Sequence, residues 1–340
     1  MTGSTLDNLA RAYIELVELN RQGAVDQARV VYQRIAHQLR AAVEGMWAQA
    51  TGEQAAGDLY AALFSFTKVL DVLRQNLLNL ELSVTKAAVF AEMARVLAAM
   101  GQTRAAAAAT ALAASGGASF YQPAPTCQVA ILGALLEALF GRGSDRCFVE
   151  VGAYDGESYS NTSCLADRGW RGLYIEPVER AYLKCVERHR ANPRVQVSNH
   201  AIGPEAATIR FWDNGEFSTG SPDEMALNVA SGWLDSAGAR EIAVPQVRLD
   251  TALRQAGIEP GFDLLVIDVD GMEEAVFQSF DLAVWRPRCM IVELIELSPG
   301  FVGQDDLIAS AARVRAAIER GGYHTVYRDH GNTVFERAAA

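Results

Sequence analysis

The chain has 340 residues, of which 50% are hydrophobic and 21% are charged, as is typical of a globular protein large enough for two domains. A formal net charge of −11 without a basic stripe argues against nucleic acid as the main partner and against an anionic membrane surface. No apolar run is long enough for a membrane span, the first residues lack a signal-peptide pattern, and the five cysteines are scattered. We therefore expect a soluble protein of the reducing cytoplasm.

Residues 1–115 are predicted to form an all-α helical bundle. One apolar stripe consists of Leu6, Leu9, Tyr13 and Val17, and a second runs from Val25 to Leu39. The strongest pattern alternates spacings of four and three over three heptads, at Leu59, Leu63, Phe66, Leu70, Leu73, Leu77 and Leu80. Further helices are predicted near 89–100 and 105–114. The seam suits either packing inside the bundle or an interface, through which the chain would form a homo-oligomer or dock a partner.

Residues 116–126 are rich in glycine and proline and are predicted to link the bundle to a second domain at 127–340. There a helix at 127–140 precedes apolar strands that alternate with helices, which is typical of a parallel sheet covered on both faces. The predicted strands are 147–151, 172–176, 194–198, 263–268 and 289–295, and the predicted helices lie near 158–168, 179–190, 250–257, 272–281 and 305–320. The final residues, 322–336, predict a β-hairpin.

The stretch Phe148-Val-Glu-Val-Gly-Ala-Tyr-Asp-Gly156 ends the first of these strands in a loop with two glycines. Glycine lets a ligand approach the backbone, and a helix that starts soon afterwards offers free N–H groups. The middle glycine of the dinucleotide motif G-x-G-x-x-G is missing, which disfavours a nicotinamide oxidoreductase. The carboxylates of Glu150 and Asp155 would repel a pyrophosphate but suit a cationic ligand such as S-adenosylmethionine (SAM). An ordinary strand-to-helix turn explains this stretch equally well by itself.

Further polar residues follow the neighbouring strands. Glu176 ends the second strand, where folds of this kind hold ribose hydroxyls. By the same rule we expect SAM to contact the strand-end residues Glu150, Gly152, Ala153, Asp155, Gly156, Glu176, Asn199 and Asp268. His200, beside Asn199, either borders the adenine or is a hydrogen-bonded structural residue.

Four blocks of this sequence carry a family resemblance: residues 147–177, 199–203, 247–251 and 263–271, with Ser160-Asn-Thr162 and Gly169-Trp-Arg-Gly-Leu-Tyr-Ile-Glu-Pro177 inside the first. Together they resemble the FkbM family of SAM-dependent methyltransferases, over about residues 125–337. Tyr154 stands where the family often has Asn, and Asp270 where it often has Glu. The resemblance implies an α/β, Rossmann-like methyltransferase fold with a C-terminal antiparallel hairpin. It also implies O-methylation of a hydroxyl on a sugar, glycoconjugate or secondary metabolite.

The segment Asp268-Val-Asp-Gly-Met-Glu-Glu274 concentrates carboxylates after the fourth strand. On extended backbone Asp268 and Asp270 share a face, so the pair would bind Mg²⁺ or supply a general base for a hydroxyl acceptor. His200 is the other candidate base. Glu273 and Glu274 suit the start of the next helix, where acids are stabilising.

An insertion at about 204–248 interleaves aromatic and acidic residues: Phe211, Trp212, Asp213, Glu216, Phe217, Asp223, Glu224, Trp233 and Asp235. This pattern suits a small-molecule or saccharide acceptor, and a satellite hydrophobic cluster under a long loop explains it as well. The alternative to an enzyme is a non-catalytic helical interaction protein with a degenerate SAM-binding domain. Stabilisation of the purified protein by SAM or its demethylated product would distinguish the two.

Overall fold

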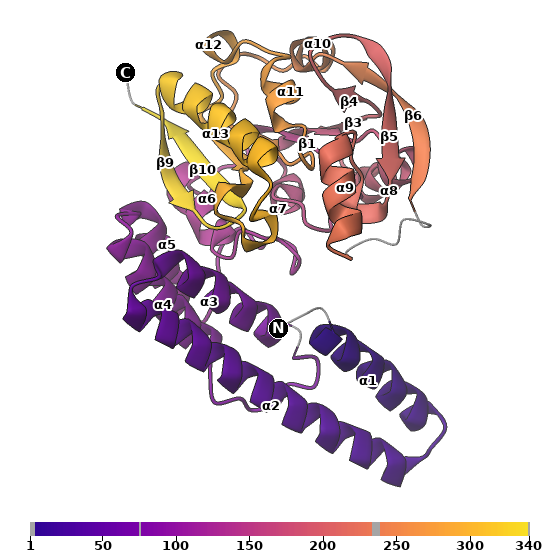
Figure 1. Ribbon diagram of the computed structural model, residues 1–340, viewed down its shortest axis with the longest axis vertical. Helices are drawn as coiled ribbons and strands as arrows, with labels where there is room; N and C mark the ends of the chain where they lie inside the picture. The colour runs from indigo at the N-terminus through magenta and orange to yellow at the C-terminus, as the bar shows by residue number, and fades with distance from the viewer. Residues whose placement is uncertain (1–3, 75, 233–238, 339–340) are drawn as a thin grey trace. The chain divides into compact units, whose positions relative to one another are not determined.

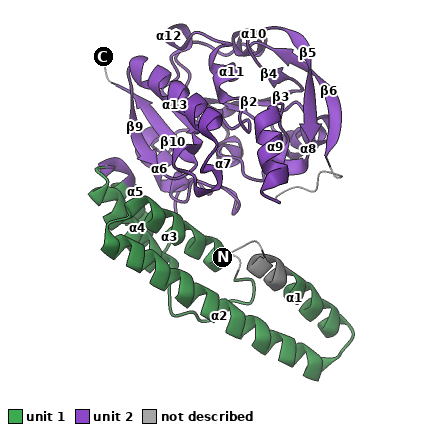
Figure 2. Cartoon of the chain, in the orientation of Figure 1, with its two compact units in different colours: residues 1–101, 106–118 green, residues 102–105, 119–340 purple. Residues whose placement is uncertain are grey.

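The computed structural model describes residues 4–74, 76–232 and 239–338. The chain separates into two compact units, residues 1–101 with 106–118 and residues 102–105 with 119–340 (Figure 2). Among the described residues, no helix has both the length and the apolar character needed to cross a membrane.

The first unit is helical, as its apolar periodicity predicts. Its helices are α1 (Ser4–Arg21), α2 (Val25–Ala56), α3 (Leu59–Arg74), α4 (Lys86–Ala99) and most of α5 (Thr103–Ala114) (Figure 1). The seam of α3 is buried at Leu63, Phe66, Leu70 and Leu73. The ring of Phe66 meets that of Trp47 on α2 edge to face, with 5.5 Å between centroids. This face of α3 is therefore part of the core of its own unit.

Three details of the predicted helices are wrong. Val25, where the second predicted stripe begins, is 72% exposed. The seam does not continue for three heptads, because α3 ends early and Leu77 is 71% exposed. The side chain of Asn76 donates to the carbonyl of Leu80 and accepts from its N–H, and this closes a loop where the helix was expected to continue. On α1 the buried stripe includes Leu16, whereas the predicted Val17 is 67% exposed.

The second unit is built on a seven-stranded sheet in the order β3-β2-β1-β7-β8-β10-β9. Its strands are β1 (Cys147–Val151), β2 (Arg171–Ile175), β3 (Val195–Ser198), β7 (Leu264–Ile267), β8 (Cys289–Glu293), β9 (Tyr323–Arg328) and β10 (Asn332–Arg337). Neighbours are parallel except at β10, which is antiparallel to both β8 and β9. The predicted Rossmann-like fold with a terminal antiparallel hairpin is confirmed. Its strand order reverses at β1 and β7, where such sheets hold ligands.

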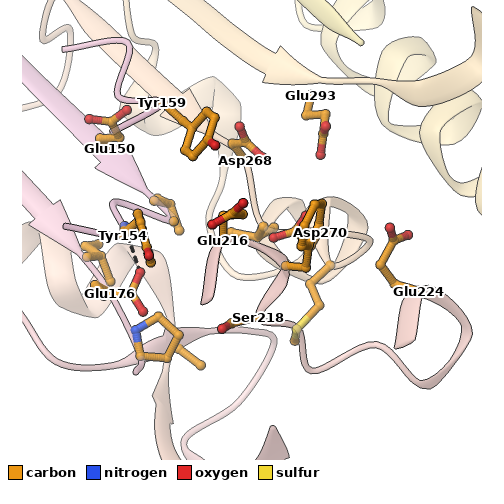
Figure 3. A pocket seen from close by; sticks show the side chains of 18 of the residues that line it. Glu150, Tyr154, Tyr159, Glu176, Glu216, Ser218, Glu224, Asp268, Asp270 and Glu293 are labelled. Carbon is orange, nitrogen blue, oxygen red and sulfur yellow. Dashed lines mark hydrogen bonds between the residues drawn. The ribbon is translucent and has the colours of Figure 1, made fainter. Parts of the chain in front are cut away.

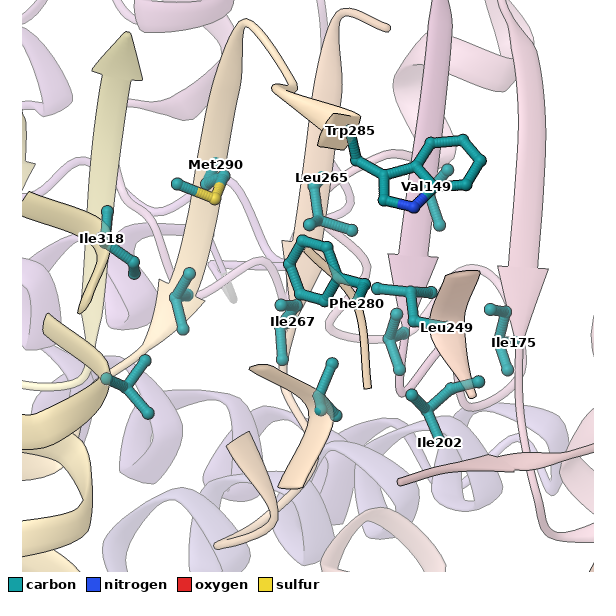
Figure 4. Close-up of a cluster of buried hydrophobic side chains, with 14 of the residues drawn as sticks. Val149, Ile175, Ile202, Leu249, Leu265, Ile267, Phe280, Trp285, Met290 and Ile318 are labelled. Atoms are coloured by element: carbon teal, nitrogen blue, oxygen red, sulfur yellow. The ribbon is translucent and has the colours of Figure 1, made fainter. Parts of the chain in front are cut away.

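Helices bury both faces of this sheet. On one face α10 (Leu249–Gln255), α11 (Glu273–Phe277), α12 (Leu282–Trp285) and α13 (Asp305–Arg320) pack over strand residues such as Val149, Leu265 and Met290 (Figure 4). On the other face lie α6 (Leu132–Phe140), α7 (Ser163–Asp167) and α8 (Glu179–His189), where Tyr174 stacks on His189 with ring centroids 4.6 Å apart. Because side chains alternate along a strand, Glu150 points away from the face that buries Val149.

The helix predicted near 158–168 is shorter than expected, since α7 begins only at Ser163. Gly156 and Tyr159 have φ values of 75° and 62°, which interrupt any helix before that point. The glycine loop after β1 therefore does not run directly into a helix N-terminus.

The insertion, together with residues 201–202 just before it, forms a second sheet that was not predicted from the sequence. Its strands are β4 (Ala201–Ile202), β5 (Ala207–Asp213) and β6 (Arg240–Val247) in the order β4-β6-β5, with α9 (Pro222–Ala230) and the short turn η1 (Gly215–Phe217) between β5 and β6. Asp213 pairs with Arg180 of α8 and with Arg240. Burial raises the pKa of Asp213, but these two arginines together lower it below its ordinary value. Trp233 and Asp235 lie outside the described residues.

The second half of the predicted linker packs against the second unit. Tyr121 is fully buried, donates a hydrogen bond to the carbonyl of Gly141 and meets the Trp170 ring edge to face. Residues 119–126 are thus part of the second unit.

Candidate functional site

A cavity of about 340 Å³ opens at the carboxyl ends of β1, β2, β7 and β8. Its volume is within the range of small-molecule sites. Figure 3 shows Glu150 and Glu176 toward one end of the cavity, and Asp270, Glu224 and Glu293 toward the other. The insertion supplies a further wall through η1 and α9.

Gly152 allows two strand ends to meet at this cavity. Its φ is 86°, and a Cβ at this position would lie 1.7 Å from the carbonyl oxygen of Asp268. Gly156 has a similar backbone, and a Cβ there would lie 2.7 Å from the sulfur of Cys185 on α8. Gly152 lines the cavity, whereas Gly156 serves the packing of the loop on α8.

Glu150 is almost fully buried and holds the loop that precedes α7. Its carboxylate accepts hydrogen bonds from the hydroxyls of Ser160 and Thr162, at 2.8 and 2.6 Å, and from the N–H of Asn161 at 2.9 Å. Burial raises the pKa of Glu150 to about 7, although these donors oppose the shift. The side chain reaches the cavity wall, but both oxygens are engaged within the loop.

Glu176 extends from β2 into the cavity with a fixed orientation. One oxygen accepts the N–H of Tyr154 at 2.9 Å, and the other accepts the N–H of Val178 at 2.8 Å. Burial raises the pKa of Glu176 to about 7. Tyr154 has a φ of 47°, an uncommon value for a bulky residue, and its bond to Glu176 helps to hold this conformation.

Three carboxyl groups meet beyond β7 and β8. The side chains of Asp268, Asp270 and Glu293 each offer an oxygen, and these oxygens all lie within 4.8 Å of one another. Burial raises the pKa of all three, and the neighbouring carboxylates raise those of Asp270 and Glu293 further. With their oxygens this close, the carboxyl groups of the cluster would repel one another if all were ionised, and a proton or a cation between them would relieve that repulsion.

The insertion positions the Asp270 end of this cluster. Asp270 has a φ of 47°, and its carbonyl accepts the hydroxyl of the fully buried Thr219 at 2.7 Å. A Cβ on Gly271 would lie 3.3 Å from a carboxylate oxygen of Glu224, so this carboxylate packs directly against the loop. Burial, together with Asp268, raises the pKa of Glu224 to about 7.

The chain matches the sequence profile of the methyltransferase FkbM domain over residues 150–325, a little more than half of its length. It belongs to the FkbM methyltransferase family. The expected resemblance is confirmed, and methyl transfer with SAM as the donor is the chemistry that the family implies for this cavity.

Comparison with known proteins adds little beyond the family. No curated protein matches the chain. An O-methyltransferase from Bacillus cereus, solved in complex with SAH, is 16% identical with a TM-score of 0.37, over 73% of this chain and 98% of that one. The CurJ carbon methyltransferase is 12% identical with a TM-score of 0.33, over 99% of both chains. At these scores neither alignment supports a statement about the reaction of this protein.

Not every residue predicted to bind the cofactor lines the cavity of the FkbM domain. Ala153, Asp155, Gly156 and Asn199 lie outside its wall. The Asp155 carboxylate accepts the N–H groups of residues 157 and 158, at 3.0 and 2.7 Å, and so shapes the loop. The Asn199 amide donates to the carbonyls of residues 176 and 177, at 2.9 and 3.1 Å, and so fixes the end of β2. His200 does line the cavity, and its Nδ1 lies 3.0 Å from the hydroxyl of Ser198.

Several cavity residues of the FkbM domain were missed from the sequence. Tyr154 and Tyr159 follow β1, and Asn228 lies on α9. Glu216 and Glu224 had been noted in the insertion, but nothing assigned them to this wall. Glu216 and Glu224 are eight residues apart, and no helix or strand was predicted between them. The sequence therefore did not indicate that both side chains would line the cavity at the end of β7. The acidic residues Glu273 and Glu274 do begin α11, as predicted.

Proposed function

We propose that this protein is a SAM-dependent O-methyltransferase that acts on a hydroxyl of a small molecule or saccharide. The observation that supports this most is the position of Glu176 beside Gly152 in a cavity of an FkbM domain. Each oxygen of Glu176 accepts one backbone N–H and keeps a free lone pair, which fits a ribose with two adjacent hydroxyls. Bound SAM supplies an electrophilic methyl group on a sulfonium.

Asp268 and Asp270 are the proposed acid–base residues. A hydroxyl must lose its proton as it is methylated, and a carboxylate with a raised pKa is a suitable acceptor for that proton. Glu293 is the third carboxyl group of this cluster and would help to hold that proton. His200, at the same cavity, is the alternative base.

The same carboxylates also fit a metal ion. Mg²⁺ prefers oxygen ligands, and the oxygens of Asp268, Asp270 and Glu293 are close enough to share one ion. Such an ion would orient the acceptor oxygen and lower its pKa. Loss of activity in EDTA that Mg²⁺ restores would support the metal, whereas full activity in EDTA would leave the carboxylates as base and orienting groups.

The proposed function is tested by titrating the purified full-length protein with S-adenosylhomocysteine (SAH) in a calorimeter. Transfer of labelled methyl groups from SAM to a panel of polyols is then measured. We expect saturable SAH binding and transfer of the methyl group to a hydroxyl oxygen. The product should be a methyl ether, which is stable to mild acid and base. Absence of SAH binding would refute the enzyme and favour a degenerate domain, and transfer to carbon or nitrogen would refute O-methylation alone.

We also propose that the second unit carries the activity by itself, with residues 1–115 as a separable helical domain. A fragment of residues 119–340 should remain folded and bind SAH as the full chain does, whatever its oligomeric state in size-exclusion chromatography. An insoluble fragment would indicate that the helices complete its core.

A further inference from the structure

One face of α9 is turned toward the cavity. Glu224 and Asn228 are separated by one helical turn, so their Cβ atoms lie about 5–6 Å apart on the same face. Both side chains line the cavity, and they are only 4% and 1% exposed. The hydroxyl of Ser221 caps the helix by accepting the N–H of Glu224 at 3.2 Å, which fixes the first turn.

Neither side chain has a partner among the residues that the structure describes. The amide nitrogen and oxygen of Asn228 are both buried without a hydrogen bond. The carboxylate of Glu224 takes part in none of the hydrogen bonds or ion pairs between described residues. It also lies outside the cluster of Asp268, Asp270 and Glu293 whose oxygens could share a metal ion. Buried polar groups are nearly always paired in folded proteins, so this pair of side chains points to a ligand.

The charge of the cavity restricts what that ligand is. Seven acidic side chains line it, and among the described residues no lysine or arginine does. At the end of the cavity where Glu224 lies with Asp270 and Glu293, a phosphate or carboxylate would therefore meet repulsion and a lack of cationic donors (Figure 3). A protonated amine donates hydrogen bonds and carries the compensating charge. A hydroxyl both donates and accepts, and so satisfies both atoms of Asn228 at once.

We propose that Glu224 and Asn228 recognise the methyl acceptor, and that the acceptor is a hydroxylated amine, such as an amino sugar. Glu224 binds its ammonium group, and Asn228 binds a hydroxyl one or two carbons away. This inference rests on the proposed methyltransferase function and adds the acceptor class to it. The helix that carries both residues belongs to the insertion, outside the seven-stranded sheet.

Three probes with the same carbon chain test the charge preference: 1-amino-1-deoxy-D-sorbitol, D-sorbitol and D-gluconate. Each is titrated into full-length protein saturated with SAH. We expect the amine to bind about tenfold more tightly than sorbitol, as a charge-assisted hydrogen bond would give, and gluconate to bind most weakly. Equal binding of the three probes, or a preference for gluconate, would overturn the proposal.

Variants assign the preference to α9. Glu224→Gln should abolish the advantage of the amine over sorbitol while the affinity for SAH stays within about twofold. Asn228→Leu should weaken amine and sorbitol alike. The matched control is Asp223→Asn, which removes an exposed carboxylate from the same helical turn and should preserve the preference.

The outcomes separate this inference from the proposed function. An amine preference that survives in Glu224→Gln overturns the assignment, and so does a loss of SAH affinity in that variant, because Glu224 would then belong to the donor site. Failure of the wild-type protein to bind SAH overturns the methyltransferase and the acceptor together. A melting curve of each variant with SAH verifies that the substitution has left the fold intact.

Discussion

Replacing Glu150 by Gln tests whether this buried carboxyl group makes the stability of the second unit depend on pH. Gln retains the shape of the side chain. The amide oxygen of Gln can accept the N–H of Asn161, and its NH₂ group can donate to the hydroxyl of Thr162. The Thr162 hydroxyl can then donate to the hydroxyl of Tyr174, 3.2 Å away, instead of to residue 150. The substitution therefore removes an ionisable group while leaving most of the local contacts in place.

The magnitude follows from the pKa. Burial raises the pKa of Glu150 from 4.5 to about 7. A shift of one pKa unit corresponds to about 1.4 kcal/mol, so this shift changes the free energy of unfolding by about 3 kcal/mol between low and high pH. Because the folded state favours the protonated form, the contribution of this group is complete below pH 4.5 and is lost as the pH rises through 7. The wild-type protein should therefore lose stability between about pH 5 and 8, relative to the variant, by about 3 kcal/mol.

Urea unfolding of the ligand-free proteins, followed by near-ultraviolet circular dichroism at several pH values, measures this difference. We expect Glu150→Gln to be slightly less stable than wild type at about pH 5, where it has weaker hydrogen bonds, and more stable at about pH 8. Glu259→Gln, at an exposed site, is the control, and its free energy of unfolding should change with pH as that of wild type does. Parallel curves for Glu150→Gln as well would refute the reasoning, since Glu150 would then be equally ionised in the folded and unfolded chain.

Other substitutions test the cavity. Glu176→Ala should weaken SAH binding by about 1.5–3 kcal/mol in calorimetry with the fold intact, and an unchanged affinity would remove Glu176 from the cofactor site. Asp268→Asn and Asp270→Asn should each lower kcat by about 100-fold with little change in SAH affinity, and full turnover in both would direct attention to His200. Gly152→Ala should abolish folding of the second unit, because its Cβ would overlap the carbonyl of Asp268, whereas Gly261→Ala, with a φ of 84° but open space, should cost only about 1 kcal/mol in the same unfolding assay.

The order and type of the main elements could be predicted from the sequence because they depend on local patterns. Each buried strand is a short apolar run, and α13 begins and ends where its periodicity indicates, at Asp305 and Arg320. The placement of Glu176 at the end of β2 followed from the same pattern, since parallel strands bring their carboxyl ends to one edge of the sheet. The family resemblance rested on these blocks, and the sequence profile confirms it.

The tertiary structure decided which polar side chains are free to meet a ligand. Glu150 was expected to bind SAM, and it does line the cavity, but its oxygens also accept hydrogen bonds from donors ten to twelve residues later in the chain, which the sequence did not indicate. Conversely, Asn228 carries no sequence signal, because it lines the cavity from a helix between β5 and β6, in a part of the chain for which no elements were predicted. A periodic pattern reports which side of an element is buried. It does not report whether a buried donor or acceptor finds a partner, because that partner comes from a distant segment and is fixed only when the chain has folded.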